Sequence, residues 1–219
     1  MTGSNSLTLR REPQQARSRA RLAELMDAAE RLLVSEGAEA LTTTRIAAGA
    51  GVSIGSLYRY FLDKGAIVDA LTRRYLEEFE ATINALADQV PGDGWEDPAG
   101  TLLDAFAARG VSQPGYRALW LGRHFSEELR AADRANKAVL ADGVMRILVG
   151  AGLIADCEGA ATACRAAVLA ADALLHESFR LDPGGDPMLM AEAKELLRAH
   201  LQSVTIRFPP APTPRPATD

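Results

Sequence analysis

The 219-residue chain has few of the residues on which most enzyme and metal sites depend. It contains two cysteines and three histidines, and it lacks a Cys-x-x-Cys pair, a glycine-rich phosphate loop after a strand, and a nucleophile elbow. His124 with Glu127 and Glu128 resembles a metal cluster only loosely, because glutamates at the start of a helix are already favoured by the helix dipole. We therefore expect no catalytic residue, no metal site and no cofactor.

Long apolar runs are also absent. The N-terminus lacks the apolar stretch of a signal peptide, and no run of about 18 apolar residues is free of charge. Cys157 and Cys164 lie two turns apart in a segment that reads as helix, too far apart to bridge each other, so we expect two buried thiols in a reducing compartment. The sequence thus predicts a cytoplasmic protein with no membrane partner.

The net charge of -5 would by itself argue against nucleic acid as a partner, because neutralising phosphates needs Lys and Arg. The distribution of charge changes this conclusion. Residues 1–64 hold 9 Lys and Arg against 7 Asp and Glu, whereas the remaining residues hold 15 against 22. The excess of acid therefore lies outside the N-terminal segment, and that segment stays a candidate for binding DNA.

The segment from Thr42 to Lys64 predicts two short helices joined by a tight turn. Thr42 and Ser53 are placed to cap the two helices, and Gly51 can supply the positive φ that the turn needs. Ile46, Ala47 and Leu57 are expected to point inward. The second helix is too short for a core element, and its short, aromatic and cationic side chains fit a DNA major groove.

The same segment carries a family resemblance. Thr-Thr followed by Ile-Ala-x-x-Ala-Gly-Val-Ser-x-Gly-x-Leu-Tyr-x-Tyr-Phe-x-x-Lys resembles the DNA-binding signature of the tetracycline-repressor (TetR) family of bacterial transcription regulators. Many positions agree at fixed spacing, which makes the signature specific. The likeness covers residues 17–79, and the rest of the chain is similar to the family in helical layout and length.

The resemblance and the helical periodicity together predict an all-α fold of about nine helices. We expect an N-terminal three-helix helix-turn-helix DNA-binding domain followed by a helical ligand-binding and dimerisation domain. The expected boundaries are a disordered basic arm at 1–16, the DNA-binding domain at 17–64, the second domain at 65–208 and a disordered proline-rich tail at 209–219. The arm is either a solvated tail or a contact to phosphates or a minor groove.

Glycine, proline and capping aspartate residues mark the expected helix ends. Gly37 ends the first helix, Asp63 caps a long fourth helix, and Asp97-Pro98 begins another after the break at residues 91–94. A short helix is expected at 116–124 and a longer one from Ser126 to Gly152. The inward residues of the longer helix are predicted to be Leu129, Val139, Leu140, Val144, Ile147 and Leu148. The last two helices are expected at 159–181 and 187–208.

The resemblance also implies which residues contact DNA. Thr43 and Thr44, at the start of the first motif helix, are expected to contact a phosphate together with Tyr58 and Lys64. Base reading falls to Ile54, Gly55, Ser56, Arg59 and Tyr60. Arg59 is suited to a bidentate contact with guanine and Ile54 to a thymine methyl group. Tyr60 either reads bases or packs beside Phe61.

In the family, the second domain commonly encloses a small-molecule pocket and the last two helices form the dimer interface. The pocket lining is expected from Phe106, Tyr116, Trp120, His124, Val144, Leu148, Asp172, His176 and Phe179, each of which could instead only pack the core. These residues suggest a hydrophobic or amphipathic ligand. The alanine-rich segment 159–181 and the leucine-striped segment 187–208 suit a close helix-helix seam. Their pattern alone leaves open whether that seam is intramolecular or between two copies.

Three functions are compatible with these features. The first is a homodimeric, sequence-specific DNA-binding transcriptional regulator, a repressor released from a pseudo-palindromic operator by a small-molecule effector. Repression here is the family's common mode. The second is a small-molecule binding or sequestering helical protein with a vestigial DNA-binding face. The third is an architectural or protein-docking helical module, which would not need the threonine-to-lysine spacing.

Overall fold

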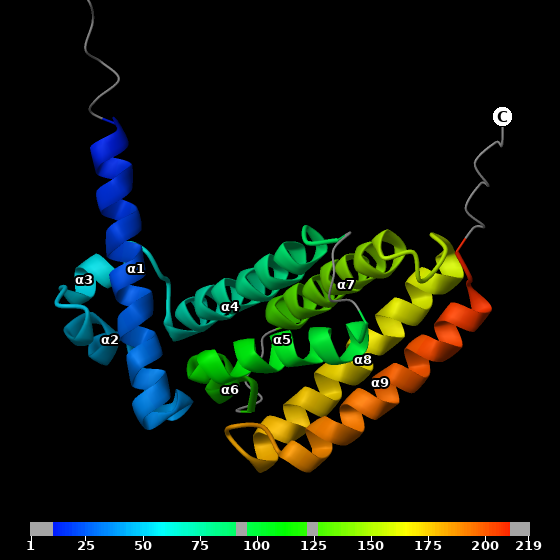
Figure 1. The fold of residues 1–219 in the computed structure, drawn as a ribbon. Coiled ribbons are helices and arrows are strands. Elements are labelled where there is room, and N and C mark those ends of the chain that lie inside the picture. The colour runs from blue at the N-terminus through cyan, green and yellow to red at the C-terminus, as the bar shows by residue number, and fades with distance from the viewer. Residues whose placement is uncertain (1–10, 91–95, 122–126, 211–219) are drawn as a thin grey trace, which may run out of the picture. The chain divides into compact units, whose positions relative to one another are not determined.

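The computed structural model describes residues 11–90, 96–121 and 127–210, which form two compact units. The first unit comprises residues 11–73 and 118–121, and the second comprises 74–90, 96–117 and 127–210. The described residues contain nine α-helices, one 3-10 helix and no strand (Figure 1). The prediction of an all-α fold with about nine helices is therefore confirmed. Of the helices described, none is both long enough and apolar enough to cross a membrane.

The first unit is built on helix α1, Arg11–Glu36, which packs with the 3-10 helix η1, Ala38–Ala40, and with α2, Thr43–Gly49. Helix α3, Ile54–Leu57, follows, and α4, Lys64–Ala87, contributes its first residues to this unit. Nine apolar side chains among the described residues of this unit are no more than 1% exposed and form its core: Leu25, Ala28, Ala29, Leu33, Leu41, Ile46, Leu57, Ile67 and Leu71.

Helix α1 begins inside the segment that was expected to be disordered. Residues 11–16 were expected to be part of a disordered arm, but they are helical. The reason is local: the segment is rich in arginine, glutamine and alanine, which favour helix, and Pro13 lies in the first turn, where a missing backbone N–H costs nothing. The remainder of the predicted arm, residues 1–10, lies outside the described residues.

The predicted helix ends at Gly37, Asp63 and Asp97 are confirmed. Gly37 follows α1 with a φ of 82°, a left-handed conformation that suits glycine. The Asp63 carboxylate accepts a hydrogen bond from Ala66 N at 2.9 Å, and Asp97 accepts one from Gly100 N at 3.1 Å. The expected break at 91–94 and the tail from residue 211 lie outside the described residues.

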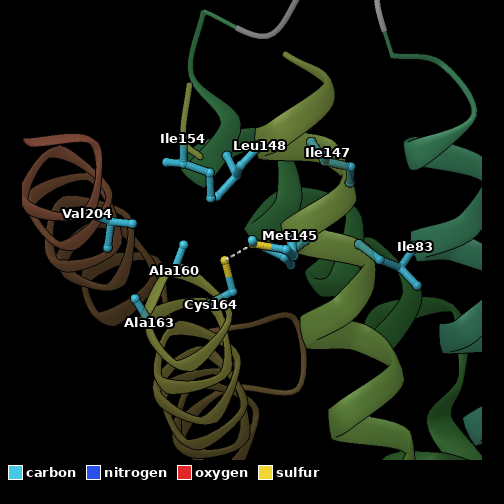
Figure 2. Close-up of a cluster of buried hydrophobic side chains, with 10 residues drawn as sticks. Ile83, Met145, Ile147, Leu148, Ile154, Ala160, Ala163, Cys164 and Val204 are labelled. Carbon is cyan, nitrogen blue, oxygen red and sulfur yellow. Dashed lines mark hydrogen bonds between the residues drawn. The ribbon is translucent and has the colours of Figure 1, made fainter. Parts of the chain in front are cut away.

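The second unit contains the rest of α4 and the helices α5, Pro98–Ser112, α7, Glu127–Gly150, α8, Glu158–Leu181, and α9, Pro187–Arg207. Helix α6, Pro114–Leu121, begins in this unit. Helices α7, α8 and α9 pack in sequence, α8 and α9 lying side by side (Figure 1). Their main core cluster is completed by Ile83 of α4 and also contains Val144, Met145, Ile147, Leu148, Ile154, Ala160, Ala163, Cys164 and Val204 (Figure 2).

The two cysteines have different surroundings. Cys164 is buried in the core cluster with its Sγ 3.8 Å from the Sδ of Met145, and burial raises the pKa of its thiol to about 11 (Figure 2). Cys157, in contrast, is exposed at the N-cap position of α8, so the prediction that both thiols are buried was wrong for it. A cap position lies outside the regular helix, and the helical periodicity of neighbouring residues says little about its burial.

Helix α5 runs through Gly110 to Ser112, and the ring of Phe179 occupies the space where a side chain at 110 would lie. Helix α7 differs from the prediction in two details. Val139 was expected to point inward but is 37% exposed. Helix α7 ends at Gly150, two residues before the predicted end, and Gly152 takes a φ of 68° in the following turn.

Helix α4 is joined to α7 within the second unit by two close contacts. Gly143 lies against Ile83, so closely that a β-carbon at 143 would overlap the Ile83 side chain. Two turns earlier in α7, the buried Asn136 donates from its Nδ2 to the Leu76 carbonyl and to a Glu80 carboxylate oxygen, each at 3.1 Å. A backbone carbonyl and a side chain of α4 are thus both fixed by one amide of α7.

We expect Gly143→Ala to lower the free energy of unfolding by about 1–3 kcal/mol, because the added methyl group overpacks the contact with Ile83. Helix propensity alone would act in the opposite direction, by about 1 kcal/mol. Denaturant unfolding followed by circular dichroism measures the change. The matched control is Gly143→Ala in an Ile83→Ala background, where the space is open and the glycine substitution should be neutral or stabilising. Stabilisation of the otherwise unchanged protein by Gly143→Ala would contradict the overlap.

Candidate functional site

Helices α2 and α3 form a helix-turn-helix whose ends are closed by local hydrogen bonds. The Thr42 hydroxyl accepts from Arg45 N at 3.2 Å and caps α2. At the other end, Gly51 has a φ of 65° and its N–H bonds to the Ala48 carbonyl, while Val52 N bonds to the Ala47 carbonyl, both at 3.0 Å. This pair of bonds is a Schellman motif, which ends α2 and turns the chain toward α3. The predicted capping threonine and turn glycine are confirmed.

Helix α3 is a single turn that presents most of its side chains to solvent. The Ser53 hydroxyl accepts from Ser56 N at 3.2 Å and caps it, and Leu57 is its buried residue. Ile54 and Gly55 are exposed, and Ser56 is half-buried. A β-carbon at Gly55 would meet no atom within 4 Å, so this position lies against open space. The helix therefore has one anchoring side chain and a free outer surface.

Arginines from α1 and α2 hold this motif in place. Arg31 of α1 donates from Nη2 to the Gly49 carbonyl at 3.1 Å, which satisfies a carbonyl at the end of α2. Arg45 of α2 pairs with Glu36 of α1, and this hydrogen-bonded guanidinium holds the pKa of the Glu36 carboxyl below its usual value. These contacts were not predictable from the sequence, because each joins two helices and neither leaves a local signature.

Two of the predicted phosphate contacts lie next to each other. The Thr43 hydroxyl, at the start of α2, is 3.3 Å from the phenol oxygen of Tyr58, which directly follows α3. Tyr58 is 54% exposed, and the neighbouring Thr44 is exposed as well. Hydroxyl groups beside the unpaired N–H groups of a helix start form an arrangement that suits an anionic oxygen.

The remaining residues predicted to contact DNA differ in whether their side chains already bond to other residues of the first unit. Arg59 is exposed, and its guanidinium makes no ion pair or side-chain hydrogen bond among those found in the described residues. Tyr60 is half-buried, and its phenol oxygen accepts from the Ser18 hydroxyl of α1 at 3.5 Å. Lys64 is half-buried and donates from Nζ to the Ala38 carbonyl at 2.9 Å. Tyr60 and Lys64 thus also join helices of the first unit.

The described residues that were predicted to line a ligand pocket have different surroundings. Val144 and Leu148 lie in the main core cluster, and Phe106 packs at its edge. Phe179 packs on Gly110, with the guanidinium carbon of Arg117 5.6 Å from the centre of its ring. His176 is half-buried on α8. The side chain of Trp120, which lies in α6, and all of His124 are outside the described residues.

Tyr116 is the predicted pocket residue that lies among both aromatic and charged side chains. Its ring centre is 5.0 Å from that of Phe79 and 5.9 Å from that of Tyr75, and Phe79 also stacks on Phe106 with the ring centres 5.9 Å apart. Burial raises the pKa of Tyr116 well above its usual value, and the nearby carboxylates of Asp172 and Asp133 raise it further.

These two carboxylates share one ammonium group. Lys137 Nζ lies 2.6 Å from Asp133 Oδ2 on the same helix and 3.0 Å from Asp172 Oδ2 on α8. Burial raises the pKa of Asp133 even though Lys137 acts in the opposite direction. Burial alone would lower the pKa of Lys137, but Asp172 and Asp133 raise it above its usual value. Asp172 was predicted from the sequence, whereas Asp133 and Lys137 were not, because an i,i+4 pair usually lies on a solvated helix face.

Comparison with known proteins gives two matches to family models. Residues 25–71 match the model described as bacterial regulatory proteins, tetR family. Residues 93–204 match the model described as the tetracyclin repressor-like C-terminal domain. Among curated proteins, the chain is similar to YvkB of Bacillus subtilis strain 168, a helix-turn-helix-type transcriptional regulator, with 36% identity over 73 residues. That alignment covers 33% of this chain and 36% of YvkB.

Solved structures match over most of the chain. A TetR-family transcriptional regulator from Streptomyces coelicolor is 32% identical with a TM-score of 0.62, and the match covers 84% of this chain and 99% of that one. The multidrug binding protein EbrR, solved in complex with imidazole, is 25% identical with a TM-score of 0.59, over 89% of this chain and 98% of that one.

Proposed function

Because the chain belongs to the TetR family of bacterial transcription regulators, we propose that it is a homodimeric repressor that binds a pseudo-palindromic DNA operator. A small molecule bound in the second unit would release it. The observation that carries the DNA-binding part is the pairing of Thr43 with Tyr58 beside the exposed outer surface of α3. We assign DNA binding to residues 17–64, and effector binding and dimerisation to residues 65–208.

In this proposal α3 enters the major groove while side chains around it hold the DNA backbone. Thr43, Thr44 and Tyr58 bind a phosphate, and such contacts fix the register without reading sequence. Lys64 adds a second phosphate contact, because an ammonium group has three donors and one of them is used on Ala38. Base reading falls to the exposed residues Ile54, Gly55 and Arg59 with Ser56. The Ser18 contact favours a packing role for Tyr60.

The basic start of α1 is a second candidate DNA contact. Arg17, Arg19 and Arg21 are exposed on a regular helix. A helix with its side chains is about 10–12 Å wide, whereas the minor groove is about 6 Å wide. A helical arm therefore does not fit a minor groove, and we propose that these arginines bind phosphates along its edge.

Two helices of the second unit supply a surface for the second copy. On α8 the exposed residues Thr162, Ala166, Leu169 and Ala173 recur at steps of four and three. On α9 a similar exposed row contains Glu192, Leu196, Ala199, Ser203 and Ile206. Small side chains at such spacing allow helix backbones to approach closely. Two-fold pairing of this surface would place the two α3 helices on half-sites about one DNA turn apart, ~34–36 Å.

Effector binding in the second unit is supported by two observations. Its interior carries aromatic rings and partly buried charges at Tyr116, a combination that structural packing alone does not require. In addition, EbrR, to which this chain is similar, is a multidrug binding protein. A ligand that binds the DNA-incompetent conformation more tightly than the competent one would lower the affinity for the operator.

We expect the purified protein to bind a palindromic fragment from the DNA flanking its coding region in a mobility-shift assay at moderate salt. Binding should survive an excess of unrelated DNA, because base contacts add to the phosphate contacts that any DNA offers. Shuffled fragments of the same composition are the control. Equal binding to both fragments, or no binding, would exclude a sequence-specific repressor. Ligand binding without DNA binding would support the sequestering alternative.

Arg59→Ala and Lys64→Ala should weaken DNA binding in different ways. Loss of a bidentate base contact at Arg59 should cost about 1–3 kcal/mol for the preferred site and little for a substituted site. Loss of Lys64 should weaken binding to both sites alike and reduce the slope of log K against log salt by about 1. Titrations at several salt concentrations measure both effects. Thermal unfolding of Lys64→Ala checks the loss of its bond to Ala38. Identical behaviour of the two variants would contradict the division of roles.

Leu196→Glu should convert the dimer to a monomer, because it places a charge in the centre of the proposed α8 and α9 seam. Leu196 is 51% exposed in the single chain, so the substitution should leave the fold of that chain intact. Sedimentation velocity measures the mass, and circular dichroism the fold. The matched control is Val111→Glu, which adds the same charge at an exposed apolar residue of α5. A dimer that survives Leu196→Glu would exclude this seam.

A further inference from the structure

The side chains around Tyr116 offer a ligand more acceptors and negative charge than an apolar pocket would. We call Gln113, Tyr116, Asp133, Lys137 and Asp172 the Tyr116 cluster. Gln113 lies between α5 and α6, Tyr116 lies in the first turn of α6, and the other three come from α7 and α8, all within the second unit. The rings of Tyr75 and Phe79 contact Tyr116 and add an aromatic wall from α4.

The charges of the cluster do not balance. Asp133 and Asp172 share the single ammonium group of Lys137, at 2.6 and 3.0 Å, which leaves one excess negative charge. The side chains of Lys137 and Asp133 are only 15% and 18% exposed, so water screens this charge poorly. The side chain of Asp172 is 33% exposed and is therefore the member that a ligand can reach from solvent.

Gln113 adds an acceptor that lacks a donor. It is 6% exposed and lies one helical turn before Tyr116. Its Nε2 donates to the Glu78 carboxylate, which Arg109 also contacts at 3.4 Å. Its Oε1 is buried and accepts no hydrogen bond from any described residue. A buried acceptor without a donor is costly, so a ligand that brings an N–H group would gain from meeting it.

We propose that the Tyr116 cluster binds an aromatic organic cation carrying N–H donors, such as an amidinium or a protonated amine. The positive group lies beside Asp172, and the aromatic body lies against Tyr116 and Phe79. The ammonium group of Lys137 already lies between the two carboxylates, which leaves no place there for a metal ion. This inference rests on the proposed effector role of the second unit and replaces a general amphipathic ligand with a cationic one.

Three probes of nearly the same shape separate charge from size: benzamidine, benzamide and benzoate. We expect isothermal titration of the full chain to show benzamidine binding at least about tenfold more tightly than benzamide, and no binding of benzoate. Asp172→Asn should remove most of the preference for benzamidine, while Lys137 keeps its partner Asp133. The matched control is Glu177→Gln. It removes one negative charge from the same helix, at an exposed ion pair with Arg180.

Equal affinity for benzamidine and benzamide, or no benzamidine binding at all, would overturn the proposal. Both results come from the unaltered protein, so they do not depend on the folding of a variant. The titrations contain no DNA and are therefore independent of operator binding. A protein that binds its operator but shows no Asp172-dependent preference would keep its proposed function and lose this site. One that prefers benzamidine through Asp172 but binds no operator would keep the site and lose the function.

Discussion

A helix of four residues does not form by itself in water, and this constraint shapes the first unit. Nucleating a helix fixes several residues for the first hydrogen bond, so a single turn such as α3 needs support from its surroundings. That support comes from the Ser53 cap, the Schellman turn at Gly51 and the burial of Leu57. Helix α3 packs against α2. With its inner side held by Leu57, α3 leaves Ile54 and Gly55 exposed to solvent.

Local signals made most of this unit predictable from the sequence. Caps, the positive φ of Gly51 and the inward positions of Ile46 and Leu57 depend on neighbouring residues, and the structure agrees with all of them. Contacts between helices were not predictable in the same way. The bond from Arg31 to the Gly49 carbonyl and that from Lys64 to the Ala38 carbonyl join residues far apart in the chain, so they depend on how the helices cross.

The second unit was predictable in outline and less so in detail. Periodicity placed the helices, but it could not distinguish a pocket from a core, and Val144 and Leu148 lie in the main core cluster. Periodicity also could not show that Asp133 and Lys137 are half-buried. Their pair lies beside Tyr116 because Lys137 also binds Asp172 on α8, and this contact between helices cannot be seen in the sequence. Charged residues at helical spacing look alike in sequence whether they face water or a neighbouring helix.

The buried amide of Asn136 has a consequence for movement of α4 along α7. It holds both the Leu76 carbonyl and Glu80 of α4, so a shift of α4 by one residue, about 1.5 Å along its axis, would break both bonds before new ones could form. A buried amide without partners costs about 1–3 kcal/mol. Arrangements of the two helices in which the Asn136 amide has no partner therefore have a higher free energy than the one observed. The two hydrogen bonds of Asn136 therefore oppose sliding of α4 along α7.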